Sequence, residues 1–359
     1  MRTARSLLAL AALLLGTSAA IAEVPRVVAS IKPVEALVAA VMGDLGTPDL
    51  LVKGTASPHS YSLRPSNAAA LQQADIIFWT GHQFEVFLED ALGTLAPNAL
   101  AVALGEAPGI TLLPVREGGA FEGHDHAAHA EHDHDDHDSH DHDSHDHDEH
   151  DHDSHDHDSH DHEAHDDDHA GHDHAADAHD AHAGHDHGEM DMHTFLDPAN
   201  AKAMVDLIET TLAKADPDNA AVYAQNAAAE RLALDALIAT VTARLEPVRG
   251  RPIIVFHDAY QYFEARFGLN VVGSVTVSPE NLPGADRIAE IRDKLKTLEA
   301  ACVFAEPNFD ARIVDVLVEG TSARTGTLDP EGASLEPGPR LYDRLILGLA
   351  DGLLACLAD

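Results

Sequence analysis

The chain has 359 residues and a formal net charge of −40 at pH 7, from 62 acidic and 22 basic side chains. This excess of negative charge argues against nucleic acid as a partner, because phosphate binding needs Lys and Arg gathered on one face, and it suits a protein that attracts cations. About 270 residues remain once a leader and a His-rich tract are set aside, which is enough for two α/β lobes of ordinary domain size.

Residues 1–22 have the pattern of a secretory signal peptide. Two arginines in the first five residues precede an apolar core at 7–15 and an Ala-Ile-Ala cleavage site at 20–22. The apolar core is too short to span a bilayer, and no later segment is long enough to do so. We therefore expect the mature chain to begin at Glu23 and to be a soluble protein of the periplasm.

The segment 23–117 alternates between predicted strands and helices. Apolar, β-branched runs indicate strands, and Ala- and Leu-rich stretches between them indicate helices. The expected strands cover 26–31, 49–53, 74–81 and 99–104, and the expected helices cover 33–42, 67–73 and 83–92. Such alternation predicts a mostly parallel sheet with helices on both faces.

A tract of His and Asp then interrupts the chain. Residues 124–187 contain 24 His, 21 Asp and 3 Glu, with no Lys or Arg, and part of the tract repeats His-Asp-His-Asp-Ser. Because residues 124–187 contain no apolar residue larger than Ala, the tract cannot bury enough surface to fold, so we expect the loop 118–189 to be disordered. Imidazole and carboxylate groups bind transition metals, and an unstructured repeat would hold them loosely. The tract is interpreted as a low-affinity metal collector; a solvated or pH-responsive acidic linker is the alternative.

Predicted order returns at Met192-His193-Thr194, and two helices are expected over 198–214 and 217–246. The second helix would measure about 45 Å, long enough to run along two lobes. A second alternating series follows. Its expected strands cover 252–256, 271–275, 301–305 and 325–328, and its expected helices cover 258–267, 284–298, 310–319 and the region from 340 onward.

These elements predict an α/β protein of two lobes, each with a mostly parallel sheet flanked by helices. The N-terminal lobe would comprise 23–117 and 190–215, the linking helix 216–247, and the C-terminal lobe 248–359. Ligands of open α/β sheets bind at the carboxyl ends of the strands, so a metal is expected in a cleft between the lobes.

Four histidines lie outside the tract, and each is a candidate metal ligand. His257 directly follows a predicted strand, His59 lies in a polar loop after another strand, His193 stands at the exit of the tract, and His82 follows a third strand. Three or four imidazoles from distant loops could close on one ion. Neutral nitrogen ligands favour Zn over Mn or Mg, and three of them leave a fourth position for water or a carboxylate.

The two cysteines, Cys302 and Cys356, are an even number in a protein expected to be exported. This favours a disulfide, whereas buried free thiols or metal ligands are the alternatives.

Several motifs occur in an order that resembles the periplasmic zinc-binding proteins of bacterial zinc ABC importers, the ZnuA type of the cluster A-I solute-binding family. The segments that carry the resemblance are ASPHSYSLRPS (56–66), MHTFLDP (192–198), FHDAYQYFEARFGL (256–269), CVFAEPNF (302–309) and GTLDP (326–330). The resemblance extends over nearly the whole mature chain, 24–359, and a His- and Asp-rich insertion is typical of the same family.

The resemblance implies two α/β lobes joined by a rigid helix, with one Zn²⁺ bound by His59, His193 and His257 rather than His82. It also implies a Cys302–Cys356 disulfide. Some relatives place Glu before the first ligand histidine, where this chain has Pro58. The fourth ligand would then be water, Glu306 or Asp310.

The predicted function is capture of Zn²⁺ in the periplasm and delivery to the membrane permease of an ABC importer, without catalysis. The tract would supply additional weak zinc sites. A periplasmic zinc chaperone is a further candidate partner, and a monomer is expected. The alternatives are a zinc buffer or chaperone without a permease, a manganese-binding relative, and a three-histidine zinc enzyme, although no metalloprotease motif such as H-E-x-x-H occurs.

Overall fold

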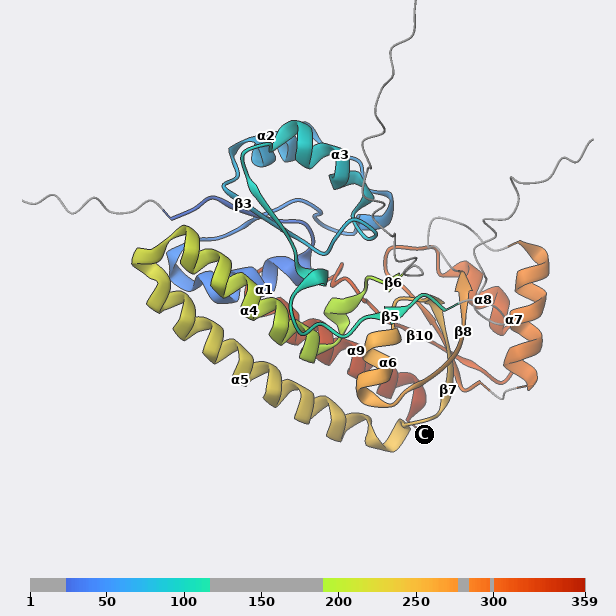
Figure 1. The fold of residues 1–359 in the computed structure, drawn as a ribbon. Coiled ribbons are helices and arrows are strands. Elements are labelled where there is room, and N and C mark those ends of the chain that lie inside the picture. Colours follow the sequence, from blue (N-terminus) through green and yellow to red (C-terminus); the bar gives the residue numbers. More distant parts are fainter. Residues whose placement is uncertain (1–23, 117–189, 277–283, 298–299, 359) are drawn as a thin grey trace, which may run out of the picture. The chain divides into compact units, whose positions relative to one another are not determined.

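The computed structural model describes residues 24–116, 190–276, 284–297 and 300–358 (Figure 1). The expected signal peptide (1–22) and the expected His/Asp-rich loop (118–189) lie outside the described residues.

The first sheet is parallel throughout, as predicted. Its strands are β1 (Val27–Ala29), β2 (Asp49–Leu50), β3 (Ile76–Trp79) and β4 (Leu100–Ala103), in the order β2-β1-β3-β4. Strand β2 is shorter than the expected 49–53. The backbone N–H groups of Leu51 and Val52 nevertheless donate to the carbonyls of Ala29 and Ser30, at the end of β1. We call the part built on this sheet, with residues 190–215, the N-terminal lobe.

Alternating side chains of this sheet face two different cores. Val27 and Ala29 of β1 face a large core shared with the C-terminal lobe, while Val28 between them faces a smaller one. The larger core is built with α1 (Lys32–Met42) and α4 (Pro198–Ala215), and the smaller one with α2 (Pro65–Gln73) and α3 (Val86–Leu95). The central strands β1 and β3 are thus buried on both faces, which explains their continuous apolar sequences.

The second sheet repeats this plan and defines the C-terminal lobe. Its parallel strands are β7 (Pro252–His257), β8 (Asn270–Thr276), β9 (Cys302–Ala305) and β10 (Arg324–Thr327), in the order β10-β9-β7-β8. Its helices are α6 (Gln261–Phe267), α7 (Ala285–Thr297), α8 (Arg312–Val318) and α9 (Leu341–Leu357). In β7, Ile253 and Val255 face the shared core, while Ile254 and Phe256 face a separate core with α7 and α8.

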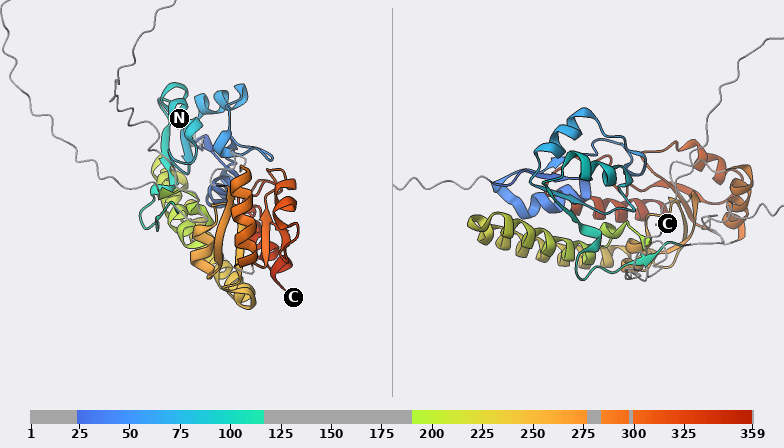
Figure 2. Two further views of the ribbon diagram at one scale, coloured as in Figure 1. Left: turned by 90° about the vertical axis from the view of Figure 1, so that its right-hand side faces the viewer. Right: turned by 45° about the horizontal axis from the view of Figure 1, so that its top comes forward.

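Helix α5 (Ala220–Leu245) connects the two lobes, consistent with the long linking helix that was predicted (Figures 1 and 2). It begins after a short turn at Pro217–Asn219 and would measure about 39 Å. Asn226 near its start donates to the carbonyl of Val41 in α1, and Arg244 near its end pairs with Asp351 in α9. The helix therefore contacts both lobes. None of the described helices has the length and apolar character needed to cross a membrane.

A short pair of antiparallel strands, which the sequence did not predict, joins the chain just before residue 117 to the chain just after residue 189. Leu113 of β5 (Leu113–Pro114) pairs with Asp191 of β6 (Met190–Asp191). Side chains of α6 hold this ribbon: the Tyr262 hydroxyl donates to the carbonyl of Asp191 at 2.5 Å, and Gln261 donates to the carbonyl of Pro114 at 3.0 Å.

A disulfide joins Cys302 of β9 to Cys356 of α9 within the shared core, and both cysteines are buried. Closing a loop with a sequence separation of 54 stabilises the folded state by restricting the unfolded chain.

Replacing both cysteines by Ala should therefore lower the free energy of unfolding by about 4 kcal/mol. Denaturant-induced unfolding of the double variant, compared with the oxidised parent, measures this change. An unchanged unfolding midpoint would show that the bond contributes nothing to stability.

A second stability effect comes from two carboxylates where α5 meets α9. Burial, and then the charge of Asp343, raise the pKa of Glu230 to about 7. Burial also raises the pKa of Asp343, one of whose carboxylate oxygens is buried without a hydrogen-bond partner in the described part of the chain. Ionising Glu230 therefore costs more in the folded than in the unfolded protein.

Because the folded-state pKa of Glu230 is raised, its stability penalty is absent below the ordinary value of 4.5, grows between there and about 7, and is complete above. After allowance for solvent screening, Glu230→Gln should stabilise the protein by about 1 kcal/mol at pH 8 and by nothing at pH 4. Thermal unfolding at both pH values tests this. A gain of equal size at both would contradict the titration account.

Candidate metal centre

His59 lies in a single helical turn, Pro58–Ser60, that follows the loop after β2. The Ser57 hydroxyl oxygen accepts a hydrogen bond from the backbone N–H of His59 at 3.3 Å, which starts the turn. The imidazole packs edge-on against the ring of Phe84, with centroids 4.7 Å apart. Its Nε2 atom is buried and has no hydrogen-bond partner in the described structure. A buried ring nitrogen without a partner is costly unless a ligand occupies it.

His193 follows β6 and is 8% exposed. One carboxylate oxygen of Asp191 lies 2.7 Å from its Nδ1 and also accepts from its backbone N–H at 2.9 Å. A carboxylate beside Nδ1 places the proton there and leaves Nε2 with a free lone pair. Asp191 therefore fixes both the orientation and the tautomer that a metal ligand requires.

His257 is the last residue of β7 and is 3% exposed. As the next residue after Phe256 in the alternating strand, it points to the side of the shared core. Its Nδ1 lies 2.8 Å from a carboxylate oxygen of Glu306, which also accepts from the Tyr260 hydroxyl at 3.1 Å. His257 thus has the same kind of carboxylate support as His193. Its carboxylate comes from the segment that follows the neighbouring strand β9.

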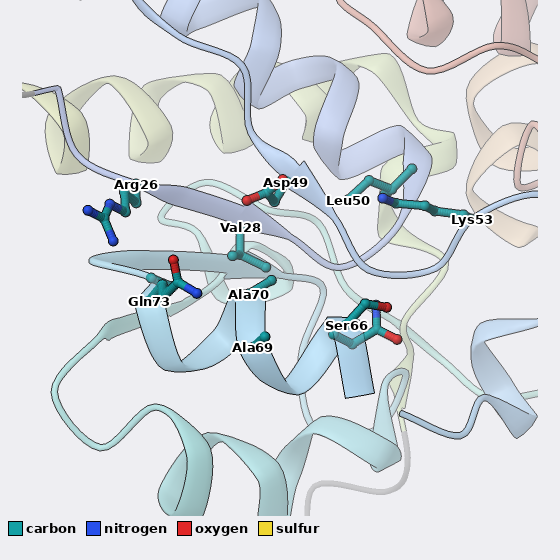
Figure 3. Close-up of a pocket in the computed structure, with 11 residues that line it drawn as sticks. Arg26, Val28, Asp49, Leu50, Lys53, Ser66, Ala69, Ala70 and Gln73 are labelled. Carbon is teal, nitrogen blue, oxygen red and sulfur yellow. The ribbon is translucent and has the colours of Figure 1, made fainter. Parts of the chain in front are cut away.

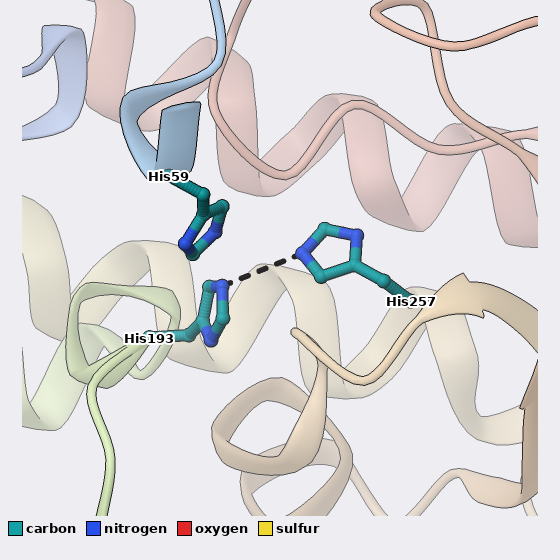
Figure 4. Close-up of side chains that lie close together, drawn as sticks. All are labelled: His59, His193 and His257. Atoms are coloured by element: carbon teal, nitrogen blue, oxygen red, sulfur yellow. Dashed lines mark hydrogen bonds between the residues drawn. The ribbon is translucent and has the colours of Figure 1, made fainter. Parts of the chain in front are cut away.

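The structure brings these three histidines together (Figure 4). Each offers a ring nitrogen, and the three atoms lie within 4.8 Å of one another. The Nε2 atoms of His193 and His257 are 3.4 Å apart. Two nitrogens in a tetrahedral zinc site, each about 2.05 Å from the ion, would be separated by about 3.3 Å. The pair therefore already has the spacing that one tetrahedral ion requires.

The electrostatics of the cluster differ from one ring to another. Burial, followed by the charges that His193 and His257 would carry, holds the pKa of His59 well below its usual range, so this ring is neutral at pH 7. Burial by itself would lower the pKa of His257, but nearby carboxylates, with Glu306 first among them, outweigh burial and raise it. A bound dication would take the place of the proton that these carboxylates attract.

Apolar and buried polar groups complete the wall of the cluster. Phe84 contacts the ring of His59 and, at 5.1 Å between centroids, that of His193. The next residue, Glu85, is fully buried and accepts from the backbone N–H groups of Thr80 and Gly81 and from the Ser30 hydroxyl. Burial raises the pKa of Glu85, while these hydrogen bonds oppose the shift. This network fixes the turn that presents Phe84 to the histidines.

The other candidate ligands lie outside the three-histidine cluster or have a different role. The His82 side chain is 57% exposed, 3.6 Å from Glu89, and outside the cluster. Asp310 is exposed and paired with Arg312. Glu306 supports His257 from behind, so we interpret it as a positioning group. The sequence predicted no supporting role for Asp191, although this carboxylate stands only two residues before His193. It predicted Glu306 as a candidate fourth ligand and not as a support for His257.

A surface pocket of about 390 Å³ lies apart from the histidines, between β2 and α2 (Figure 3). Arg26, Asp49 and Lys53 are among the side chains that line it, and the lining contains no His or Cys. The pocket therefore offers no imidazole or thiolate donor to a transition metal, and the histidine cluster remains the candidate.

Comparison with known families gives one match over almost the whole chain. The family model described as ZnuA, zinc-uptake complex component A, periplasmic, matches residues 27–355. The high-affinity zinc uptake system protein ZnuA of Brucella suis biovar 1 is 50% identical over 332 residues, which are 92% of this chain and 91% of that protein. The protein of the same name from Paracoccus denitrificans is 42% identical over 346 residues, 96% and 95% of the two chains.

Solved structures show the same fold at lower identity. A crystal structure of ZnuA has a TM-score of 0.66 at 21% identity and covers 94% of this chain and all of its own. The solute-binding protein FpvC of Pseudomonas aeruginosa, solved with Mn²⁺, has a TM-score of 0.68 at 19% identity, with coverage of 93% and 99%.

Removing the charge behind either supported ring should weaken metal binding. Glu306→Gln and Asp191→Asn keep the side-chain size but remove the anion that holds the proton on Nδ1, and each should lower zinc affinity about 10- to 100-fold. Competition with a chelator of known affinity measures this. Glu89→Gln, which alters the exposed His82 pair, is the matched control and should have no effect. Parental affinity in both buried variants would contradict the positioning roles.

Proposed function

The chain belongs to the ZnuA family of periplasmic zinc-uptake components, and from this premise we propose that it captures Zn²⁺ in the periplasm and delivers it to the permease of an ABC importer. The three imidazoles of His59, His193 and His257 would bind the ion. The observation that carries this proposal is their meeting from three separate segments of the chain, with ring nitrogens within 4.8 Å.

The chemistry of the cluster favours zinc over harder cations. Its three donors are nitrogen atoms, and no carboxylate oxygen belongs to the described cluster. Imidazole suits Zn²⁺, whereas Mn²⁺ and Mg²⁺ prefer carboxylate and water oxygen. Three protein ligands leave a fourth tetrahedral position, which we assign to water. That open position would let a permease take the ion without breaking every bond at once.

We assign the His/Asp-rich tract the role of a weak zinc collector. The support from the described residues is its point of attachment: β6 ends at Asp191, two residues before His193. Ions held loosely near that point would have a raised local concentration beside the three histidines.

The remaining parts of the proposal concern partners and location. Relatives that share half of the residues are named as high-affinity zinc uptake proteins, which supports a permease partner and a periplasmic location. We propose a monomer that binds and releases zinc and catalyses no reaction, and that can also receive zinc from a periplasmic chaperone.

Zinc titration against a competing chelator tests the proposal. A variant lacking 117–189 should retain one tight ion, because Leu113 and Asp191 are paired and the two ends of the deletion are close. His257→Ala should lower the affinity of this tight site by at least about 100-fold, more than the loss of a supporting residue. The matched control is His82→Ala, which removes an exposed histidine outside the cluster.

The outcomes separate the two zinc-binding parts of the chain. Tight binding that survives the deletion and is lost with His257 assigns the selective site to the three histidines. If the deletion variant holds no tight ion, the tract is the site and the proposal fails. Growth on scarce zinc, with and without the permease, then distinguishes an importer component from a zinc buffer.

A further inference from the structure

Lys32 occupies an unexpected place. It is in the first turn of α1, where the helix dipole disfavours a positive charge, and it is only 5% exposed. Burying an ammonium group is costly unless all its protons are bonded. Its Nζ atom donates to three carbonyl oxygens of the C-terminal lobe, those of Gly332 at 2.9 Å, Ala333 at 2.8 Å and Leu335 at 2.9 Å. An ammonium group has three protons, so its donors are fully used.

The loop that receives Lys32 is shaped by the GTLDP motif, which the metal centre does not use. The two carboxylate oxygens of Asp329 accept from the backbone N–H groups of Ala333 at 2.8 Å and Ser334 at 2.9 Å. Gly332 has a φ of +68°, a conformation that side-chain-bearing residues rarely adopt. The motif thus folds the loop so that its carbonyl groups converge on one point.

A second residue of α1 binds the same loop. Glu35 is 2% exposed and accepts from the backbone N–H of Gly338 at 2.9 Å. Lys32 and Glu35 therefore hold residues 332–338 with one positive and one negative group from a single helical turn. The partners are about 300 positions apart in the sequence, so these bonds join the lobes independently of the covalent path through α5.

The contact lies next to the segment that carries a zinc ligand. A cavity of about 10 Å³, too small for anything larger than a water molecule, is lined by Lys32 and Ala333 together with Pro58, which directly precedes His59. We therefore expect a shift of this loop to displace the turn that positions His59.

We infer that Lys32 is a positioning residue for zinc capture: by binding the carbonyl groups of Gly332, Ala333 and Leu335, it fixes the C-terminal lobe against the turn that carries His59. We call this set of bonds the Lys32 latch. This role rests on the proposed function, because it concerns how well the three histidines are preorganised for Zn²⁺. Without the latch, part of the free energy of zinc binding must be used to bring the two lobes into their binding positions, so the zinc affinity is lower.

The test compares Lys32→Met with Lys53→Met, an exposed lysine of the same lobe, in the full-length chain. Lys32→Met should weaken zinc binding about tenfold in a chelator competition at a temperature where both variants are folded, whereas Lys53→Met should match the parent. Hydrogen exchange of the metal-free protein should accelerate about tenfold at the backbone amides of residues 333–336 and of Gly338 in Lys32→Met, and remain unchanged in the strands of both sheets.

Asp329→Asn provides a second variant in case Lys32→Met does not fold. It leaves the ammonium in place but weakens the bonds that shape the loop, so it should lower zinc affinity and loop protection in the same direction. If both variants fold, their effects on zinc affinity should be less than additive, because they act through one contact.

The outcomes distinguish failure of the latch from failure of the proposed function. Tight zinc binding by the parent, with unchanged affinity in Lys32→Met or, if that variant does not fold, in Asp329→Asn, would overturn the latch, even if the melting temperature fell. Absence of tight zinc binding by the parent would overturn the proposed function, and loop exchange would still report whether Lys32 holds the loop. Unchanged exchange at residues 333–338 would also overturn the latch.

Discussion

Three imidazole rings held close together in a buried place are the constraint on which the rest of the structure depends. If all three were protonated, like charges would repel in surroundings of low polarity, so each ring must present a lone pair rather than a proton. The structure orients two of these lone pairs by placing Asp191 at Nδ1 of His193 and Glu306 at Nδ1 of His257, which leaves each Nε2 facing the cluster, and it packs His59 against Phe84. A dication at the centre would then satisfy every nitrogen at once.

The fold supplies these positions through its two parallel sheets. One histidine follows β2 of the first sheet and another ends β7 of the second, which are the carboxyl ends where open α/β sheets bind ligands. A continuous apolar core under both sheets gives the two ends a common support. The covalent link through α5 and the Lys32 latch then reduce the freedom of the lobes to separate. Preorganisation of this kind raises affinity by lowering the entropy lost on binding.

Much of this arrangement could be predicted from the sequence. Alternating apolar strands and helices indicated the two parallel sheets, and isolated histidines after strands marked the candidate ligands. The β5–β6 pair could not be found, because two residues on each side are too short for any periodic signal. The supporting role of Glu306 was also hidden, since it depends on β9 lying beside β7, a neighbour relation that sequence order does not reveal. For the same reason, the partner loop of Lys32 could be identified only in three dimensions.

The most direct test of the central claim is a crystal structure of the full-length chain loaded with one equivalent of zinc, with the ion located by anomalous scattering at the zinc edge. The account predicts a single strong peak about 2.0–2.1 Å from one ring nitrogen of each of His59, His193 and His257, with a fourth ligand that is not a histidine of the tract. A principal peak bound only by residues of the tract, with the three histidines unoccupied, would contradict it.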